Sequence, residues 1–283
     1  MFNIRWFASA TRGFATVAGA IALFSCAPKS LLSSTDARDA AEAQSTTLRG
    51  AETSGILHVA VLGDSQSTGG YGQRLADLIR NASVQRLVYF GAASSARIGS
   101  WVDGGFTPIP YNAYFGCDSA TDARSCAPQM QPGRQTQSIA TIVRQHPYVD
   151  LYVLTFGDNH FYDPSSARRD IPRLVTPILK SGVKCAFVTP TEGVGKFANK
   201  LELIRQIKLG LEDVKNANGS TCALVDSYTV GGDVLKTDSD LQLMRNASAQ
   251  DPMGLHPQGS GARLWGERVF EALLKRGLLD RLK

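Results

Sequence analysis

The sequence is short of the residues that mark several classes of protein. Its 283 residues include five cysteines and four histidines, without a Cys-x-x-Cys motif or a cluster of Cys and His, so nothing suggests a metal site and no cofactor is implied. Lys and Arg are scattered and form no basic run with interleaved aromatics, which argues against a nucleic-acid partner. The net charge of +5 either suits an anionic surface, such as a cell-wall polymer or lipid headgroups, or reflects an ordinary solvated surface.

The N-terminal part also lacks an apolar run of the roughly 20 residues that a membrane-spanning helix needs. Arg5 and Arg12 flank its start, and a shorter uncharged, mostly apolar stretch, 13–24, precedes the small residue Ser25. This order is typical of a secretory signal, which we place at residues 1–25. Residues 26–55 are rich in Ala, Ser, Thr and charge, and they predict a flexible tether.

The end of this segment, Leu-Phe-Ser-Cys at residues 23–26, resembles a bacterial lipobox. The resemblance implies that Cys26 is diacylated after cleavage. The mature protein would then be exported and anchored by lipid to a membrane, in the periplasm or at the outer membrane. Ordinary signal cleavage nearby, or a short membrane anchor, is the alternative.

If Cys26 is lipidated, four cysteines remain, and an even number in an exported protein suggests two disulfides. The economical pairing joins Cys117 to Cys126, which lie close together in a long loop. It also joins Cys185 to Cys222, each of which opens an apolar, strand-like run. Without export, buried free thiols are the expectation.

From residue 56 onward, strand-like and helical patterns alternate. Apolar, β-branched runs predict five strands at 57–62, 87–90, 149–156, 183–189 and 222–226. Apolar residues at helical spacing predict helices at 71–81, 136–145, 167–181, 199–216 and 261–276. The alternation predicts an α/β domain over 56–283 with a flavodoxin-like, doubly wound sheet of about five parallel strands and helices on both faces.

The segment 99–135 breaks this alternation. It carries five aromatic residues, several glycines and prolines, and the first cysteine pair. Long loops inside compact domains are usually functional or disordered. We expect either an ordered lid or binding wall, or a structural excursion that packs its own small core.

Residues suited to acyl transfer follow the predicted strands, and the carboxyl ends of parallel strands are where sites form in such sheets. Strand one ends in Gly63-Asp64-Ser65, and strand two ends at Gly91 to Ser94. Strand three ends in Gly157-Asp158-Asn159-His160. Asp251 and His256 precede the last helix. A serine nucleophile needs a neighbouring base. Its tetrahedral intermediate needs oxyanion donors, which the backbone N–H groups of Ser65 and of the Gly91 region and the Asn159 amide could supply.

These blocks resemble those of the SGNH (GDSL) serine hydrolases, from about residue 57 to the C-terminus. Gly63-Asp64-Ser65 resembles the first block, Gly157-x-Asn159 the third, and His256-Pro257 followed by Gly261 the last. The resemblance implies the SGNH hydrolase fold. It also implies Ser65 as nucleophile, His256 as general base and Asn159 as oxyanion donor, with Asp64 holding the nucleophile loop.

The chain departs from the family pattern in two places. The family usually has Asp three residues before its His, where this chain has Met253. Either Asp251 orients the imidazole because the loop bends, or a main-chain carbonyl does so in a Ser–His dyad. The third block ends in Asp in the family but in His160 here, which could contact substrate, compete as base, or be a turn residue. The second-block glycine is ambiguous as well: Gly91 is our choice, but Ala93 or Ser94 could present the same N–H.

Together these features predict an exported serine esterase that hydrolyses O-acyl esters, O-acetyl above all, of an envelope glycan. The same residues could instead serve an O-acyltransferase, or a lysophospholipase or thioesterase that acts on a lipid or thioester substrate. The alternative from another class is a non-catalytic glycan-binding envelope protein with a degenerate site, an idea that Met253 and His160 keep open.

Overall fold

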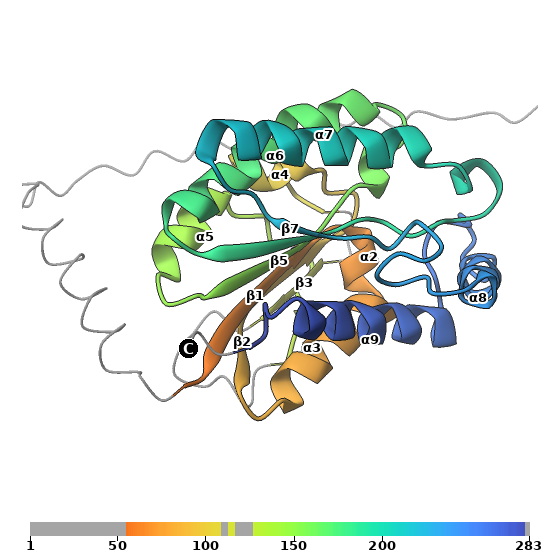
Figure 1. Ribbon diagram of the computed structural model, residues 1–283, viewed down its shortest axis with the longest axis horizontal. Helices are drawn as coiled ribbons and strands as arrows, with labels where there is room; N and C mark the ends of the chain where they lie inside the picture. The colour runs from red at the N-terminus through yellow and green to blue at the C-terminus, as the bar shows by residue number, and fades with distance from the viewer. Residues whose placement is uncertain (1–54, 109–112, 117–126, 281–283) are drawn as a thin grey trace, which may run out of the picture. The chain divides into compact units, whose positions relative to one another are not determined.

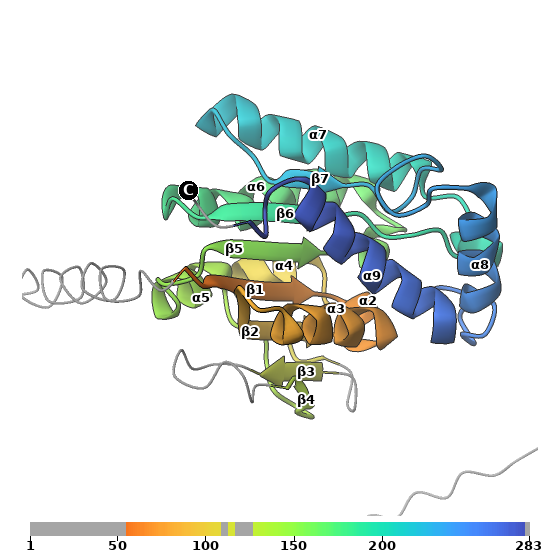
Figure 2. The ribbon, with the colours of Figure 1, turned by 60° about the horizontal axis from the view of Figure 1, so that its bottom comes forward.

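The computed structural model describes residues 55–108, 113–116 and 127–280 (Figures 1 and 2). The expected signal sequence, Cys26 and the tether up to residue 54 lie outside these residues, as do Cys117 and Cys126. Within the described part, no helix is long and apolar enough to cross a membrane.

The described residues form a seven-stranded sheet with the order β4-β3-β2-β1-β5-β6-β7, which Figure 2 shows in sequence across the molecule. Five neighbouring strands of this sheet are parallel. Numbered along the chain, they stand across the sheet in the order 2-1-3-4-5, which is the flavodoxin-like order that the sequence predicts. They are β1 (Leu57–Gly63), β2 (Gln85–Ala93), β5 (Leu151–Thr155), β6 (Lys184–Val188) and β7 (Ala223–Val225).

Helices cover both faces of the sheet, as predicted (Figure 1). One face carries α3 (Gly70–Asn81) and α9 (Gly259–Lys275), which pack together. The other face carries α4 (Ile98–Asp103), α5 (Ile139–Gln145), α6 (Pro164–Lys180) and α7 (Leu201–Asn218).

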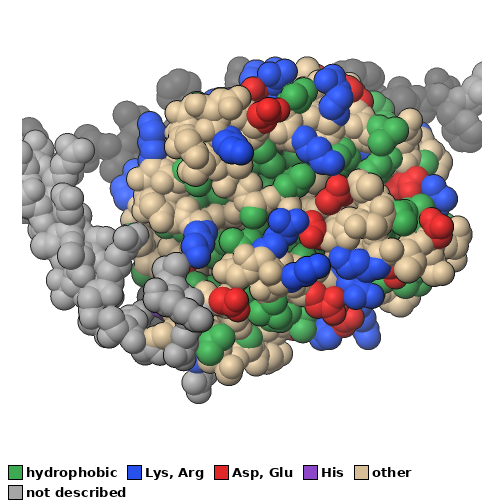
Figure 3. Space-filling model, in the orientation of Figure 1, with side chains coloured by type: hydrophobic (Ala, Val, Ile, Leu, Met, Phe, Trp, Pro, Cys, Tyr) green, Lys and Arg blue, Asp and Glu red, His purple; other side chains and the backbone are tan. Residues whose placement is uncertain are grey.

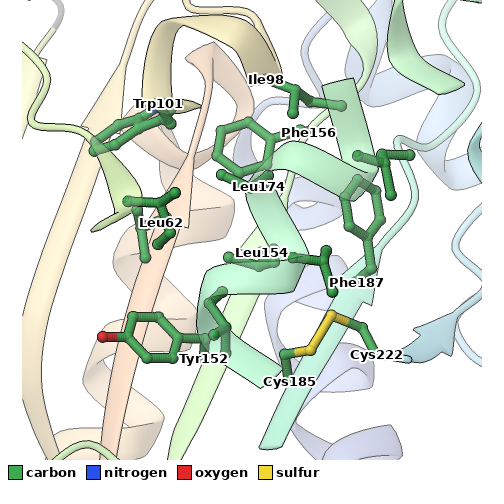
Figure 4. Close-up of a cluster of buried hydrophobic side chains, with 14 of the residues drawn as sticks. Leu62, Ile98, Trp101, Tyr152, Leu154, Phe156, Leu174, Cys185, Phe187 and Cys222 are labelled. Atoms are coloured by element: carbon green, nitrogen blue, oxygen red, sulfur yellow. A yellow bond between two sulfur atoms is a disulfide. The ribbon is translucent and has the colours of Figure 1, made fainter. Parts of the chain in front are cut away.

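Each face of the sheet has its own hydrophobic core, because successive strand residues point to opposite faces. In β1, Ala60 and Leu62 join the core beneath α4 to α7, whereas Val59 and Val61 join the core beneath α3 and α9. The first core is shown in Figure 4, where Leu62, Trp101, Phe156 and Leu174 lie around one another. In the second core Tyr71 stacks on Trp265 with ring centroids 4.0 Å apart. Burial on both faces explains why these strands have nearly continuous apolar sequences.

The described parts of segment 99–135 extend the sheet, which the sequence did not predict. β3 (Ala113–Gly116) pairs antiparallel with β2, and β4 (Gln129–Met130) pairs antiparallel with β3. Phe115 of β3 is buried against Trp101 of α4. These parts of the segment therefore have a structural role, because they extend the edge of the sheet and pack against it.

The basic excess of the sequence does not form a patch on the face shown in Figure 3, where Lys and Arg side chains are interspersed with Asp and Glu. Several of these residues pair on the outer helices. Arg168 of α6 lies 2.7 Å from Asp213 of α7, and Arg205 lies 2.7 Å from Glu202 within α7. Exposed pairs of this kind contribute little to stability.

The predicted pair Cys185–Cys222 is a disulfide in the structure. The two Cα atoms lie 4.6 Å apart, and both side chains are buried. Cys185 lies near the start of β6 and Cys222 immediately precedes β7. The bond therefore joins two parallel strands at their amino ends (Figure 4). This is the edge of the sheet opposite to the one where parallel strands place their sites.

Removal of this disulfide by the double substitution Cys185→Ala/Cys222→Ala is expected to lower the free energy of unfolding by about 2–4 kcal/mol. The bond joins residues 37 apart, so its loss frees a sizeable loop of the unfolded chain. Urea unfolding with and without dithiothreitol provides the measurement. The reductant should lower the wild-type midpoint by more than that of the variant, which keeps only the predicted pair Cys117–Cys126; an equal response of the two proteins would contradict the bond between Cys185 and Cys222.

Candidate active site

The loops after β1, β2 and β5 leave the sheet side by side. These three strands are neighbours, and Gly63, the last residue of β1, is in register with Ala92 of β2 and Thr155 of β5. β2 continues to Ala93, so the expected end of that strand at Phe90 was wrong. Pairing with β1 and β3 carries the strand past Gly91.

Ser65 is presented on a tight strand-to-helix turn. It begins the short helix α2 (Ser65–Thr68), which directly follows β1 and Asp64. The buried carboxyl group of Asp64 caps this helix by accepting from the backbone N–H of Gln66 at 3.0 Å, and it accepts from the N–H of Gly157 at 3.2 Å. Any Cβ at residue 63 would lie 2.0 Å from Ser67 Oγ, so the turn requires glycine there.

His256 links Ser65 to Asp251. Its Nε2 lies 2.8 Å from Ser65 Oγ, and its Nδ1 lies 3.0 Å from Asp251 Oδ2. The same Asp251 oxygen accepts the backbone N–H groups of Leu255 and His256, each at 2.9 Å. Met253, at the position where the family pattern has Asp, is 59% exposed. The loop therefore bends so that Asp251, and not a main-chain carbonyl, faces the imidazole.

Asp251 is held in its ionised form. Burial acts to raise the pKa of Asp251, but the hydrogen bonds from the backbone N–H groups of His256 and Leu255, together with its interaction with the His256 ring, hold the pKa below its ordinary value. An ionised carboxylate only accepts hydrogen bonds. The Nδ1 atom of His256 therefore carries the proton, and Nε2 is free to accept the proton of the Ser65 hydroxyl.

Asn159 lies beside the turn that follows β2. It belongs to the 3₁₀ turn η2 (Asp158–His160) after β5, and its Nδ2 donates to the carbonyl of Ala96 at 2.9 Å. The turn itself is closed by Ala96 N–H donating to Ala93 O at 3.1 Å. Ser95 within it has φ 63°, and no other non-glycine residue in the described part of the chain has a positive φ.

Gly91 is not in this group of residues. It lies inside β2, in register with Leu62 and Phe115, and a Cβ there would lie 2.7 Å from the Trp101 ring. The close approach of Trp101 explains the glycine. At the carboxyl end of β2, the part that adjoins Asn159 is the turn at 94–96, through the carbonyl of Ala96.

His160 is fully buried and does not face the site. Its Nε2 accepts from the Ile98 N–H at 3.0 Å, and its Nδ1 lies 2.6 Å from Ser166 Oγ. The ring is therefore neutral and protonated on Nδ1, and burial lowers the pKa of His160 to about 4. Its hydrogen bonds join the starts of α4 and α6, so it neither contacts substrate nor competes with His256.

Three further buried polar residues lie beneath these loops, and none of them was assigned a role from the sequence. Lys200 Nζ donates to Asp158 Oδ1 at 2.5 Å and to Thr191 O at 2.6 Å. Gln66 Nε2 donates to the other Asp158 oxygen and, at 3.3 Å, to Leu255 O. Lys200, Asp158 and Gln66 thus form one hydrogen-bonded cluster beneath the loops described above.

Residues of the segment after β6 also contact the helix and the loop that precede His256. Arg245 of α8 (Asp238–Ser248) lies 2.9 Å from Glu192, whose side chain is nearly buried. The backbone N–H of Val194 donates to Gly254 O at 2.8 Å. Among the described residues, no group of three or more His, Cys, Asp or Glu could hold a metal ion.

The buried state of His160 predicts a pH dependence of stability. Its pKa in the folded protein, about 4, lies below the ordinary 6.5, so the unfolded chain takes up a proton first as the pH falls. The contribution of the neutral, buried His160 to the free energy of unfolding is fully present above about pH 6.5. It is lost as the pH falls toward 4, and at pH 4.5 the loss is about 2–3 kcal/mol. Urea unfolding at pH 7 and 4.5 checks this, since His160→Gln should lose that part of the dependence. Equal pH dependence in the two proteins would contradict it.

Comparisons with known proteins give only distant likenesses. No family model matches the chain, and no curated protein matches it. One similar solved structure is a carbohydrate esterase family 3 enzyme from Talaromyces cellulolyticus, with 13% identity, 78% of this chain and 98% of that chain covered, and a TM-score of 0.41. Another is a peptidoglycan O-acetylesterase, with 12% identity, coverage of 83% and 97%, and a TM-score of 0.44. Both likenesses are too weak to bear on chemistry.

Proposed function

We propose that this chain is a serine esterase that works through a Ser65 acyl-enzyme. The observation that carries the proposal is the unbroken line of contacts from Ser65 Oγ to His256 Nε2, at 2.8 Å, and from His256 Nδ1 to Asp251, at 3.0 Å. A nucleophile, a base within hydrogen-bond reach and an ionised group that orients the base are the three parts of such a site.

In the proposed reaction, Ser65 Oγ attacks the ester carbonyl carbon while His256 Nε2 takes the hydroxyl proton. Asp251 stabilises the resulting imidazolium. The imidazolium then gives the proton to the leaving alkoxide as the C–O bond breaks, which leaves the acyl group on Ser65. Water attacks this acyl-enzyme with His256 again as base, and the carboxylic acid departs as the serine hydroxyl is restored.

The developing oxyanion needs donors already in place. Ser65 is the first residue of α2, where backbone N–H groups have no acceptor within the helix, so its N–H is one candidate. The Asn159 amide is the second, because Ala96 O uses one of its two Nδ2 hydrogens. In place of Gly91, we propose the backbone N–H groups of the turn at Ser94 and Ser95 as the source of the third.

An O-acyl ester of an envelope glycan is the substrate that we propose. The sequence supports it through the expected export signal and lipid anchor, which together predict an envelope location. Tyr162, three residues after Asn159, supports it as well, because this residue is 72% exposed and its ring offers a flat face for a sugar, with Lys196 Nζ 5.8 Å from the ring centroid. Phe161 and Phe197 pack beneath with ring centroids 5.1 Å apart, and Lys196 lies over Phe197.

Substitutions of Ser65 and Asp251 test catalysis. Ser65→Ala should abolish hydrolysis of p-nitrophenyl acetate and labelling by a fluorophosphonate, because no other group replaces Oγ. Asp251→Asn should lower kcat by about 10²–10⁴-fold, since an amide no longer holds the imidazole in the required tautomer. Asp213→Asn, which removes an exposed carboxylate on α7, is the matched control and should retain wild-type kcat. If wild type and Ser65→Ala share one background rate and neither is labelled, a non-catalytic protein is the correct interpretation.

A substitution of Tyr162 tests the substrate class. Tyr162→Ala should raise KM for an O-acetylated polysaccharide several-fold, because a stacking face for the sugar is lost. The same variant should leave hydrolysis of p-nitrophenyl acetate unchanged. Equal effects on the two substrates would argue against a glycan. Product analysis with a free glycan acceptor distinguishes hydrolysis from transfer to a sugar hydroxyl.

A further inference from the structure

A buried ion pair lies beneath the candidate active site without taking part in the proton relay. The side chains of Lys200 and Asp158 are both fully buried, and neither contacts Ser65 or His256 among the hydrogen bonds of the described residues. Removing a lysine and an aspartate from water is costly, and well-packed apolar residues are often at least as stable. The pair therefore calls for an explanation other than stability.

The hydrogen bonds of Gln66 connect this pair to the catalytic loops. Its side-chain NH₂ group donates to Asp158 and to Leu255 O. The carboxylate of Asp158 and the Leu255 carbonyl both accept hydrogen bonds, so only the NH₂ end of the amide can face them, and the orientation of the side chain is fixed. Gln66 follows Ser65, Asp158 precedes Asn159, and Leu255 precedes His256.

We propose that Lys200 is a positioning residue that, through Asp158 and Gln66, holds the loops of Ser65, Asn159 and His256 at the spacing that acyl transfer needs. The inference rests on the proposed esterase function. It assigns to Lys200 no contact with the substrate. Its Nζ also donates to Thr191 O, so the segment after β6 is held by the same group.

A cation is needed here because two carboxyl groups lie close together out of water. Asp64 anchors the turn at Ser65 and is fully buried, and Asp158 is buried nearby. Burial, and then the charge of Asp158, raise the pKa of Asp64, whereas Lys200 acts to lower it. Without Lys200, Asp158 would be a buried carboxylate with no countercharge, which is costly, so its loop would shift to reduce that burial. The hydrogen bonds of Gln66 to Asp158 and to Leu255 O would then lose their fixed geometry.

The test compares Lys200→Met, Asp158→Asn and the double variant in the full-length protein. We expect each single variant to lower kcat on p-nitrophenyl acetate by about 10–100-fold with KM within about twofold of wild type, because displaced loops misalign Ser65 and His256. Fluorophosphonate labelling of Ser65 should slow in parallel. The double variant should recover most of the rate, because the amide that replaces the Asp158 carboxylate is neutral and its carbonyl oxygen still accepts from Gln66.

Loss of stability alone is excluded by a matched control. The variant Cys185→Ala/Cys222→Ala is destabilised at the opposite edge of the sheet and should keep wild-type kcat well below its unfolding temperature. If Lys200→Met is destabilised but has the kcat and labelling rate of wild type, the pair is merely structural and the inference is wrong. Should Lys200→Met fail to fold, Gln66→Met leaves the ion pair intact and cuts its link to both loops. It should lower kcat in the same range, and an unchanged kcat would overturn the inference.

A readout without turnover separates this inference from the esterase proposal. If wild type neither hydrolyses esters nor reacts with the probe, the esterase proposal fails. The Nδ1–H proton signal of His256 in the NMR spectrum then reports the position of the histidine against Asp251. Lys200→Met should shift or broaden this signal, and the disulfide variant should not. An unchanged signal in Lys200→Met would contradict the positioning role.

Discussion

The two hydrogen bonds accepted by the carboxyl group of Asp64 are the constraint on which the site depends. One oxygen holds the N–H of Gln66 and so fixes the turn at Ser65, while the other holds the N–H of Gly157 and so fixes the loop of Asn159. The parallel register of β1 with β5 makes this bridge possible, because Gly63 and Thr155 end their strands opposite each other. A carboxyl group has two oxygens in one rigid plane, so it joins two loops at a set distance.

The histidine loop shows how a different spacing produces the same contact. Asp251 stands five residues before His256, and the chain between them reverses at Gly254, whose φ is 69°. Gly254 N–H donates to Asp251 O at 2.8 Å, and the next two N–H groups turn inward to the Asp251 carboxylate. A residue with a Cβ would be strained in that conformation. Glycine at this position thus allows the carboxylate to reach Nδ1 despite the longer loop.

The strands and most helices could be predicted because their patterns are local. Apolar runs mark β1, β5 and β6, and helical spacing marks α3, α7 and α9. The elements that were missed depend on distant partners or bury few residues. β3 is four residues long and exists by pairing with β2, and α8 buries only Met244, Ala247 and Ser248. Gly91 was also taken for the end of its strand. It lies inside β2, and the glycine there is explained by the close approach of the Trp101 ring, a contact that the local sequence does not reveal.

The candidate site was predictable only in part, for reasons that are physical as well. Ser65 and His256 follow from a resemblance in sequence, but they are 191 residues apart, and only the fold brings them within 2.8 Å. Lys200 gives no local signal, because a lysine before a helix is usually solvated, and its partner Asp158 is 42 residues away. The charge balance of the cluster matters for the proposed chemistry. An oxyanion would form above loops that contain two buried carboxyl groups, and each uncompensated negative charge would oppose it. Lys200 offsets the charge of Asp158, and the raised pKa of Asp64 favours the neutral form of the other group. The group that fixes the loops therefore also reduces the electrostatic penalty on the intermediate.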